Sequence, residues 1–159
     1  MTGHFDGAPR PPLPGDAEPI RALVWAALGI TPYVDRVIEL LSAAERGDPE
    51  SHALVTERDG AVAALALYGP VAGASATWQL NMLLVAPRVA LREVGRAMID
   101  AVVDNLRRAG ARLLIAELPA DAVLGRTLTL LRSNEFTQEG RVPDFYREGV
   151  AQLFLRRDL

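Results

Sequence analysis

Apolar residues recur at helical spacing in two consecutive segments near the start of the chain. The first segment covers residues 17–28, with Asp16 before it as a cap and Gly29 after it as a stop. The pair Thr31-Pro32 suits the start of a helix, and the same spacing then continues to about residue 46. The pattern predicts two helices in tandem.

Short apolar segments in the middle of the chain have the length of strands. Two of them, at about 52–58 and 61–69, flank Asp59-Gly60, a pair that tolerates the positive φ angles of a tight hairpin turn. The next segment, TWQLNMLLVAP at residues 77–87, is apolar almost throughout, as in a central strand that is covered on both faces. We predict a hairpin followed by the middle strand of a sheet.

Strands and helices alternate in the second half of the chain. Helical spacing extends from about Ala90 to Ala109, followed by a buried strand, RLLIAEL, and by a helix over residues 121–133 that Asp121 caps. TQEGRV and AQLFLRR form a last pair of strands, joined by the loop PDFYREG. This order predicts an α/β chain with a mixed sheet.

The residues before the first helix are rich in Gly and Pro and show no period. We expect a flexible arm at residues 1–9, and at most a short edge strand near Arg10–Leu13. Neither a linker nor an internal repeat divides residues 10–159, so we expect them to form one domain.

Charge and composition exclude several classes of function. The formal net charge is −3, so the chain has no global positive field for a nucleic acid. Without Cys, and with only His4 and His52 as imidazoles, a zinc site is not expected. No apolar run reaches the roughly 18 residues of a membrane span, and the N-terminus lacks a signal pattern, so we expect a cytoplasmic protein without a membrane partner.

The segment VAPRVALREVGRAM, residues 85–98, resembles the pyrophosphate-binding turn of the GCN5-related N-acetyltransferases (GNAT). In that family a strand ending in V-x-P leads into Q/R-x-x-G-x-G/A, and the first amides of the following helix hold the pyrophosphate of acetyl-coenzyme A. Unpaired amides at a helix start favour anions, which supports such a use.

Two registers of this turn are open. Counted from Val85-x-Pro87, the turn falls on residues 90–95, where Leu91 and Glu93 replace two glycines and only Gly95 remains. Read literally, residues 92–97 satisfy R-x-x-G-x-A, but this starts the turn two residues late. We prefer the first register. Arg88, Arg92 and Arg96 are close enough in sequence to offset the charge of Glu93.

The resemblance covers roughly residues 10–157, and the ending EFTQEGRVPDFYREGVAQLFLRR is its most specific piece, although Glu135 replaces the glycine before Phe136. It implies a single-domain α/β (α+β) GNAT-like fold, with about four helices around a mixed, mostly antiparallel, twisted sheet of six to seven strands that splays beside the middle strand. It also implies a coenzyme site that uses main-chain groups of the middle strand and of the turn. The residues of that site would be Leu83, Leu84, Val85, Ala90, Leu91, Arg92, Glu93, Val94, Gly95, Arg96 and Ala97.

Acetyl transfer to an amine needs a base more than an acid. Removing a proton from an alkylammonium of pKa about 10.4 costs roughly 4.6 kcal/mol at pH 7, whereas protonating a thiolate of pKa about 8.5 is worth roughly 2. Our candidate base is Glu117, in the apolar strand beside the expected opening of the sheet, although water relays and a merely structural Glu117 stay open.

Leu131 occupies the position where many family members place a catalytic tyrosine. Either the thiolate leaves unassisted, or Tyr146 in the loop PDFYREG supplies the proton; otherwise its ring packs over the sheet. Tyr33, between the first two helices, is our candidate for lining the acceptor pocket, because similar proteins build that pocket there.

The resemblance implies an acetyl-CoA-dependent N-acetyltransferase, without a metal, that acts on a primary amine of a small molecule or peptide by direct attack in a ternary complex. Homodimers are frequent among similar proteins. The alternative is a degenerate member that binds an acyl-coenzyme A as a sensor or structural subunit without turnover, for which Leu91, Glu93 and the missing tyrosine argue.

Overall fold

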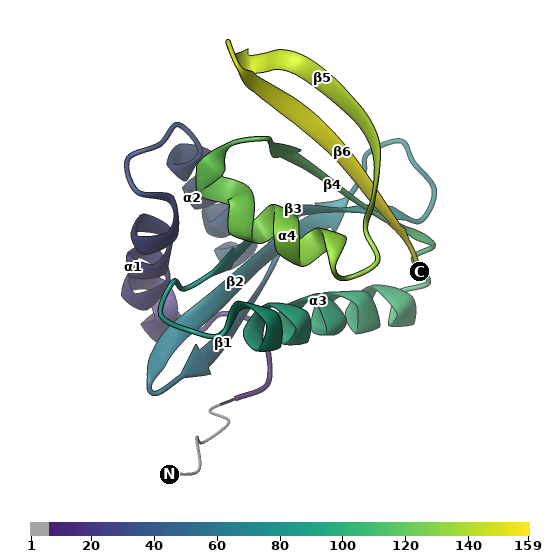
Figure 1. Ribbon diagram of the computed structural model, residues 1–159. Coiled ribbons are helices and arrows are strands. Elements are labelled where there is room, and N and C mark those ends of the chain that lie inside the picture. The colour runs from purple at the N-terminus through teal and green to yellow at the C-terminus, as the bar shows by residue number, and fades with distance from the viewer. Residues whose placement is uncertain (1–6) are drawn as a thin grey trace.

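The computed structural model describes residues 7–159, so most of the arm predicted at residues 1–9 lies outside the described residues. Figure 1 shows the chain as a sheet with helices packed around it. The elements are η1 (Pro14–Asp16), α1 (Ala17–Leu28), α2 (Val34–Glu45), β1 (His52–Arg58), β2 (Ala61–Pro70), β3 (Thr77–Val85), α3 (Leu91–Arg108), β4 (Leu113–Pro119), η2 (Ala122–Leu124), α4 (Gly125–Arg132), β5 (Thr137–Arg147) and β6 (Val150–Asp158). Four α-helices and six strands confirm the predicted fold class.

The six strands form one sheet in the order β1-β2-β3-β4-β6-β5. Only β3 and β4 are parallel; every other neighbouring pair is antiparallel. The apolar segment that sequence alone assigned to the middle of the sheet is β3, and α3 connects it to β4. Residues 62–69 of β2 are buried throughout, because α1 packs on one face of this strand and α3 on the other (Figure 1).

The sheet opens between β3 and β4. Their pairing extends only from Thr77 opposite Leu113 to Leu80 opposite Ala116, although β3 continues to Val85 and β4 to Pro119. On its other side β3 carries a bulge, because Leu67 pairs with Met82 and Tyr68 with Leu80, which leaves Asn81 as the extra residue. A bulge bends its strand and increases the local twist. The bulge therefore lies where β3 leaves β4.

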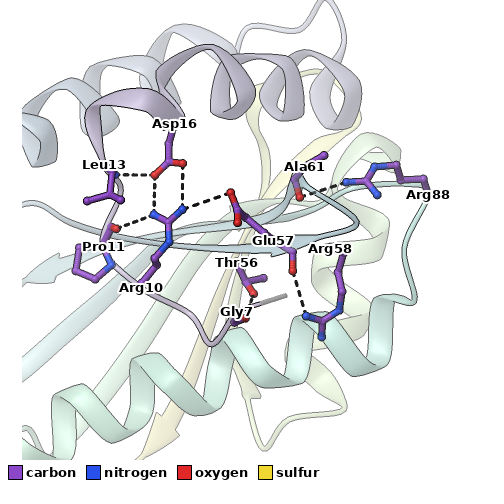
Figure 2. Close-up of polar contacts among 10 residues, drawn as sticks. All are labelled: Gly7, Arg10, Pro11, Leu13, Asp16, Thr56, Glu57, Arg58, Ala61 and Arg88. Atoms are coloured by element: carbon purple, nitrogen blue, oxygen red, sulfur yellow. Dashed lines mark hydrogen bonds and ion pairs between the residues drawn. The ribbon is translucent and has the colours of Figure 1, made fainter. Parts of the chain in front are cut away.

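The start of the described chain is fixed to the edge strand β1, as Figure 2 shows. Arg10 and Val55 exchange two backbone hydrogen bonds of 2.9 and 2.7 Å, so the predicted edge strand is reduced to this one bridge. The Arg10 guanidinium lies 2.6 Å from Asp16 and 3.4 Å from Glu57. Asp16 also accepts the Leu13 amide at 2.6 Å, and its hydrogen bond with Arg10 lowers the pKa of its carboxyl.

Two boundaries in the last third of the chain differ from the prediction. The segment PDFYREG is not a loop, because β5 continues to Arg147 and only residues 148 and 149 form the turn. Between Val142 opposite Gln152 and Arg147 opposite Val150, four residues of β5 bulge out of the ladder, and no periodicity in the sequence marks such a bulge. The predicted helix over 121–133 begins as η2, whose Val123 amide is capped by Asp121, and becomes α4 at Gly125.

Gly95 of α3 faces the side chain of Leu130 on α4. A Cβ at this position would be 2.2 Å from Cδ2 and 3.0 Å from Cγ of Leu130, a side chain that is only 1% exposed. The missing side chain of Gly95 therefore lets α4 pack onto α3.

We expect Gly95→Ala to destabilise the protein by about 1–3 kcal/mol, because the added methyl overpacks the contact with Leu130. Gly125→Ala is the matched control: it is also a helical glycine, and a Cβ there meets nothing within 4 Å. That control should be neutral or stabilising by up to about 1 kcal/mol. Urea unfolding measures both changes, and equal stability of the two variants would contradict the close approach of α3 and α4.

Candidate active site

Three residues singled out in the sequence meet in one cavity of about 470 Å³. Tyr33 comes from the connection between α1 and α2, Glu117 from β4, and Tyr146 from the bulged part of β5. Asn81 and Met82 of β3 also line it, so the cavity reaches the place where β3 and β4 separate. The fold thus brings both candidate proton-transfer groups and the candidate acceptor residue to the opening of the sheet.

Gln152 of β6 connects Glu117 to Tyr146. Its side-chain amide donates to Oε2 of Glu117 at 3.2 Å, while its carbonyl oxygen accepts the Tyr146 hydroxyl in a short hydrogen bond. Gln152 is buried, so both hydrogen bonds fix its orientation. Sequence reasoning missed this residue; the one available signal was a glutamine inside the apolar strand AQLFLRR.

The hydroxyl of Tyr146 is held in its protonated form. Burial of the ring raises the pKa of Tyr146, and the negative charge of Glu117 and the neighbouring Tyr33 raise it further. The rings of Tyr33 and Tyr146 meet edge to face, with centroids 6.1 Å apart and planes at 89°. Near neutral pH the Tyr146 hydroxyl is therefore a proton donor located one side chain away from a carboxylate.

A second polar network holds Tyr33 in the cavity wall. The Tyr33 hydroxyl donates to Oδ2 of Asp121 at 2.8 Å and accepts from Nη1 of Arg147 at 3.2 Å, and Arg147 lies 2.7 Å from the same carboxylate. The hydrogen bond with Arg147 lowers the pKa of Asp121, whereas burial raises the pKa of Tyr33. These contacts hold together three segments that lie far apart in sequence: the α1–α2 connection, the residues after β4 and the end of β5.

The start of α3 has backbone donors without partners. Ala90 is the cap position, no side chain caps the helix, and in residues 7–159 no hydrogen bond takes the amides of Leu91, Arg92 or Glu93. The amide of Val94 already donates to the Ala90 carbonyl at 3.1 Å, so the free donors are those of the first turn. This turn falls inside the register that we preferred.

Charged side chains around this turn separate into two groups. Glu93 faces β1, where it lies 3.4 Å from Arg58, and Arg88 donates to the Ala61 carbonyl at 3.5 Å (Figure 2 draws this second contact). Arg92 and Arg96 instead line a hollow of about 470 Å³ between α3 and the turn from α4 to β5. Two arginines of the predicted site thus line a hollow along the first turns of α3, where Arg96 also lies 3.6 Å from Asp100.

One predicted coenzyme group, the Leu83 carbonyl, has a protein partner, and so do two carbonyls just after β3. The Leu83 carbonyl accepts from the Thr127 hydroxyl of α4 at 2.7 Å, and Arg126 lies 3.4 Å from the carbonyls of Ala86 and Pro87. Gly95 faces Leu130, so a side chain at position 95 would meet α4 first. A ligand that uses Leu83 would have to displace the Thr127 hydroxyl.

In residues 7–159 no group of three or more His, Asp or Glu side chains is arranged to hold a metal ion. No helix in the same range has both the length and the apolar character that crossing a membrane requires.

The described residues thus combine a mixed sheet that splays at a bulge, a helix start with free amides and a cavity lined by a carboxylate. The model of the acetyltransferase (GNAT) family matches residues 19–125, and the chain belongs to this family. The family uses acetyl-CoA as co-substrate, and the chain is an acyl-CoA-dependent N-acetyltransferase, as the sequence led us to expect.

Solved structures agree with this membership. A GNAT-family protein from Desulfovibrio desulfuricans is 29% identical, with a TM-score of 0.83 over 95% of this chain and 98% of that one. A ribosomal-protein-alanine N-acetyltransferase from Brucella melitensis (22% identity, TM-score 0.74, 95% and 99% covered) shares the fold. So does a Salmonella typhimurium protein solved with its cofactor acetyl-CoA (20% identity, TM-score 0.72, 96% and 95% covered). A search of curated proteins found no match.

The coupling of Tyr146 to Glu117 can be tested by titration. We expect Glu117→Gln to lower the pKa of Tyr146, because the variant removes a negative charge that disfavours the phenolate. Ultraviolet absorbance of the phenolate measures this pKa in a Tyr33→Phe, Tyr68→Phe background, where Tyr146 is the remaining tyrosine. A Tyr146 pKa that Glu117→Gln leaves in place, or raises, would show that the two groups are not coupled.

Proposed function

We propose that this protein transfers the acetyl group of acetyl-CoA to a primary amine of a small molecule or peptide, by direct attack in a ternary complex. The observation that carries the proposal is the chain of hydrogen bonds from Tyr146 through Gln152 to Glu117, whose two end residues line the cavity at the splay. It provides a proton acceptor and a proton donor at the place where β3 and β4 leave room for the donor substrate.

The residues present suit the coenzyme. The backbone of Leu84 and Val85 lies on the part of β3 that has no β4 partner, and the free amides of residues 91–93 suit a diphosphate. Arg92 and Arg96 add positive charge beside these amides, while Glu93 is held by Arg58. When bound, acetyl-CoA supplies the activated acetyl thioester. The acetyl-CoA complex of the Salmonella protein supports this assignment by its shared fold.

Glu117 is the proposed base. The acceptor enters as an ammonium, and its first proton passes to the Glu117 carboxylate, directly or through water, and from there to solvent. The Gln152 amide donates to this carboxylate at 3.2 Å and fixes its position. The neutral nitrogen then forms its bond to the acetyl carbon while the carbon–sulfur bond breaks.

Tyr146 is the proposed acid. Its hydroxyl proton passes to the departing sulfur, and the second proton that the nitrogen loses restores the phenol through solvent, so that the products are the N-acetylated amine and coenzyme A. Gln152 holds this hydroxyl and Tyr33 packs against the ring, so both are positioning residues. The raised pKa of Tyr146 keeps its proton available near neutral pH.

The sensor without turnover remains the second candidate. Leu91 and Glu93 replace two glycines of the turn, and the Leu83 carbonyl is already bonded to Thr127, which favours weaker or altered coenzyme binding. Calorimetric titration with acetyl-CoA and a thiol-release assay over an amine panel separate the two candidates. Coenzyme binding without thiol release for any amine would favour the sensor. Failure to bind acetyl-CoA would contradict both.

The cytoplasmic location and the homodimer stay predictions.

We expect Glu117→Gln to lower kcat by about 100-fold or more with the affinity for acetyl-CoA unchanged, because the variant removes the base and leaves the coenzyme site intact. Steady-state thiol release over a pH series and calorimetry measure the two effects. Glu18→Gln, at an exposed position on α1, is the control and should behave as the wild type. A pH–rate profile that Glu117→Gln does not alter would remove Glu117 from the mechanism.

A further inference from the structure

The cavity that holds Glu117 continues into a second hollow. This second hollow, of about 450 Å³, lies between α2, residues 48–51 and the adjoining ends of β2 and β3. The two hollows share Arg36, Leu40, Gln79 and Asn81, which therefore lie where they meet. Glu117 and Tyr146 line the first hollow and not the second, so the shared residues lie on the side of the cavity that faces away from the proton-transfer groups.

Arg36 is the charged member of this shared group, and its guanidinium is exposed, so an anionic ligand can reach it. Within residues 7–159 its side chain pairs with Glu39 at 2.9 Å, three residues along the same helix, and the two side chains are 63% and 70% exposed. Such an exposed pair contributes little and exchanges readily for another anion. Arg147, the other arginine of the cavity wall, is already bound to Asp121 and Tyr33.

Two amide side chains accompany Arg36. Gln79 and Asn81 of β3 both line the two hollows, and both are half-buried. Within residues 7–159 neither side chain has a hydrogen-bond partner in the protein. A guanidinium flanked by two unpaired amides is a donor set for the oxygens of a carboxylate.

The charges along the cavity wall favour one arrangement of the acceptor. Among the described residues, the wall carries a single carboxylate, Glu117, and two guanidiniums, Arg36 and Arg147. An acceptor with several positive charges would find one carboxylate in this cavity, because the other carboxylates near Arg36, namely Glu39, Asp48 and Glu50, line the second hollow. An acceptor with one amine and one anionic group matches both ends of the cavity.

We propose that the acceptor is an amino-acid-like small molecule, in which the reacting amine lies at Glu117 and a carboxylate is bound by Arg36 with Gln79 and Asn81. This inference rests on the proposed function and narrows its acceptor class. A peptide whose amine reacts at Glu117 would present an amide at this place, and a polyamine would present a cation. Neither an amide nor a cation carries the negative charge that would pair with the Arg36 guanidinium.

Matched acceptors test the assignment. Thiol release from acetyl-CoA is measured with the standard amino acids and β-alanine, with the carboxamide of each, and with spermidine as a polycation. We expect at least one free acid to have a kcat/KM about tenfold or more above that of its carboxamide, because a charge-assisted pair is replaced by a neutral one. Spermidine should be the poorer substrate.

The variant Arg36→Gln shows whether Arg36 carries this preference. We expect it to raise KM for the preferred acid about tenfold or more, to leave the carboxamide unaffected, and to leave acetyl-CoA affinity by calorimetry unchanged. Arg107→Gln, at an exposed position on α3, is the matched control. Because both variants replace an exposed arginine, circular dichroism and thermal unfolding should match the wild type.

The outcomes separate this inference from the proposed function. Turnover with carboxamides or spermidine preferred over the free acids would overturn the carboxylate site and leave the acetyltransferase standing. An Arg36→Gln variant that changes KM for the acid and for its carboxamide by the same factor would overturn the carboxylate site in the same way. Absence of thiol release from every acceptor, with acetyl-CoA bound, would overturn the proposed function and this inference together.

Discussion

The parting of β3 from β4 beyond Leu80 is the constraint on which the site depends. Two parallel strands that stayed paired to their ends would bury the backbone of residues 81–85 in the ladder and close the cavity. The extra residue at Asn81 shifts the register on the β2 side of β3 at this point. Because the strands separate, Asn81 and Met82 of β3 line one cavity with Glu117 of β4, and β3 continues beyond this cavity toward α3.

The polar contacts around the cavity tie together segments that the sheet alone does not hold. β5 is an edge strand and its last residues bulge away from β6, yet Arg147 binds Asp121 and Tyr33, and Tyr146 binds Gln152. These interactions keep the phenol facing the carboxylate. The same bulge that breaks the ladder therefore positions the phenol of Tyr146 at the cavity, and the stability lost in backbone pairing is partly offset by charge-assisted hydrogen bonds.

Sequence periodicity was sufficient to predict most helices and strands. The buried face of α1 and the Asp59-Gly60 hairpin, for example, follow from the spacing of residues close together in the sequence. It could not reveal the β5 bulge, which depends on how β5 pairs with β6, or the hydrogen bond from Gln152 to Glu117, which joins residues 35 positions apart. Glu117, Tyr146 and Tyr33 were predicted from resemblance and residue type, whereas the neighbours Asp121, Arg147 and Arg36 belong to no motif. Gly95 was predicted for its backbone, and its contact with Leu130 required the packing of two helices.

A crystal structure of the protein with coenzyme A tests the central claim most directly. The account predicts that the pantetheine arm lies between β3 and β4 beyond Leu80 and Ala116, with the diphosphate at the amides of residues 91–93 and the thiol facing the cavity of Glu117 and Tyr146. Coenzyme bound at another surface, or a diphosphate that makes no contact with the first turn of α3, would contradict it.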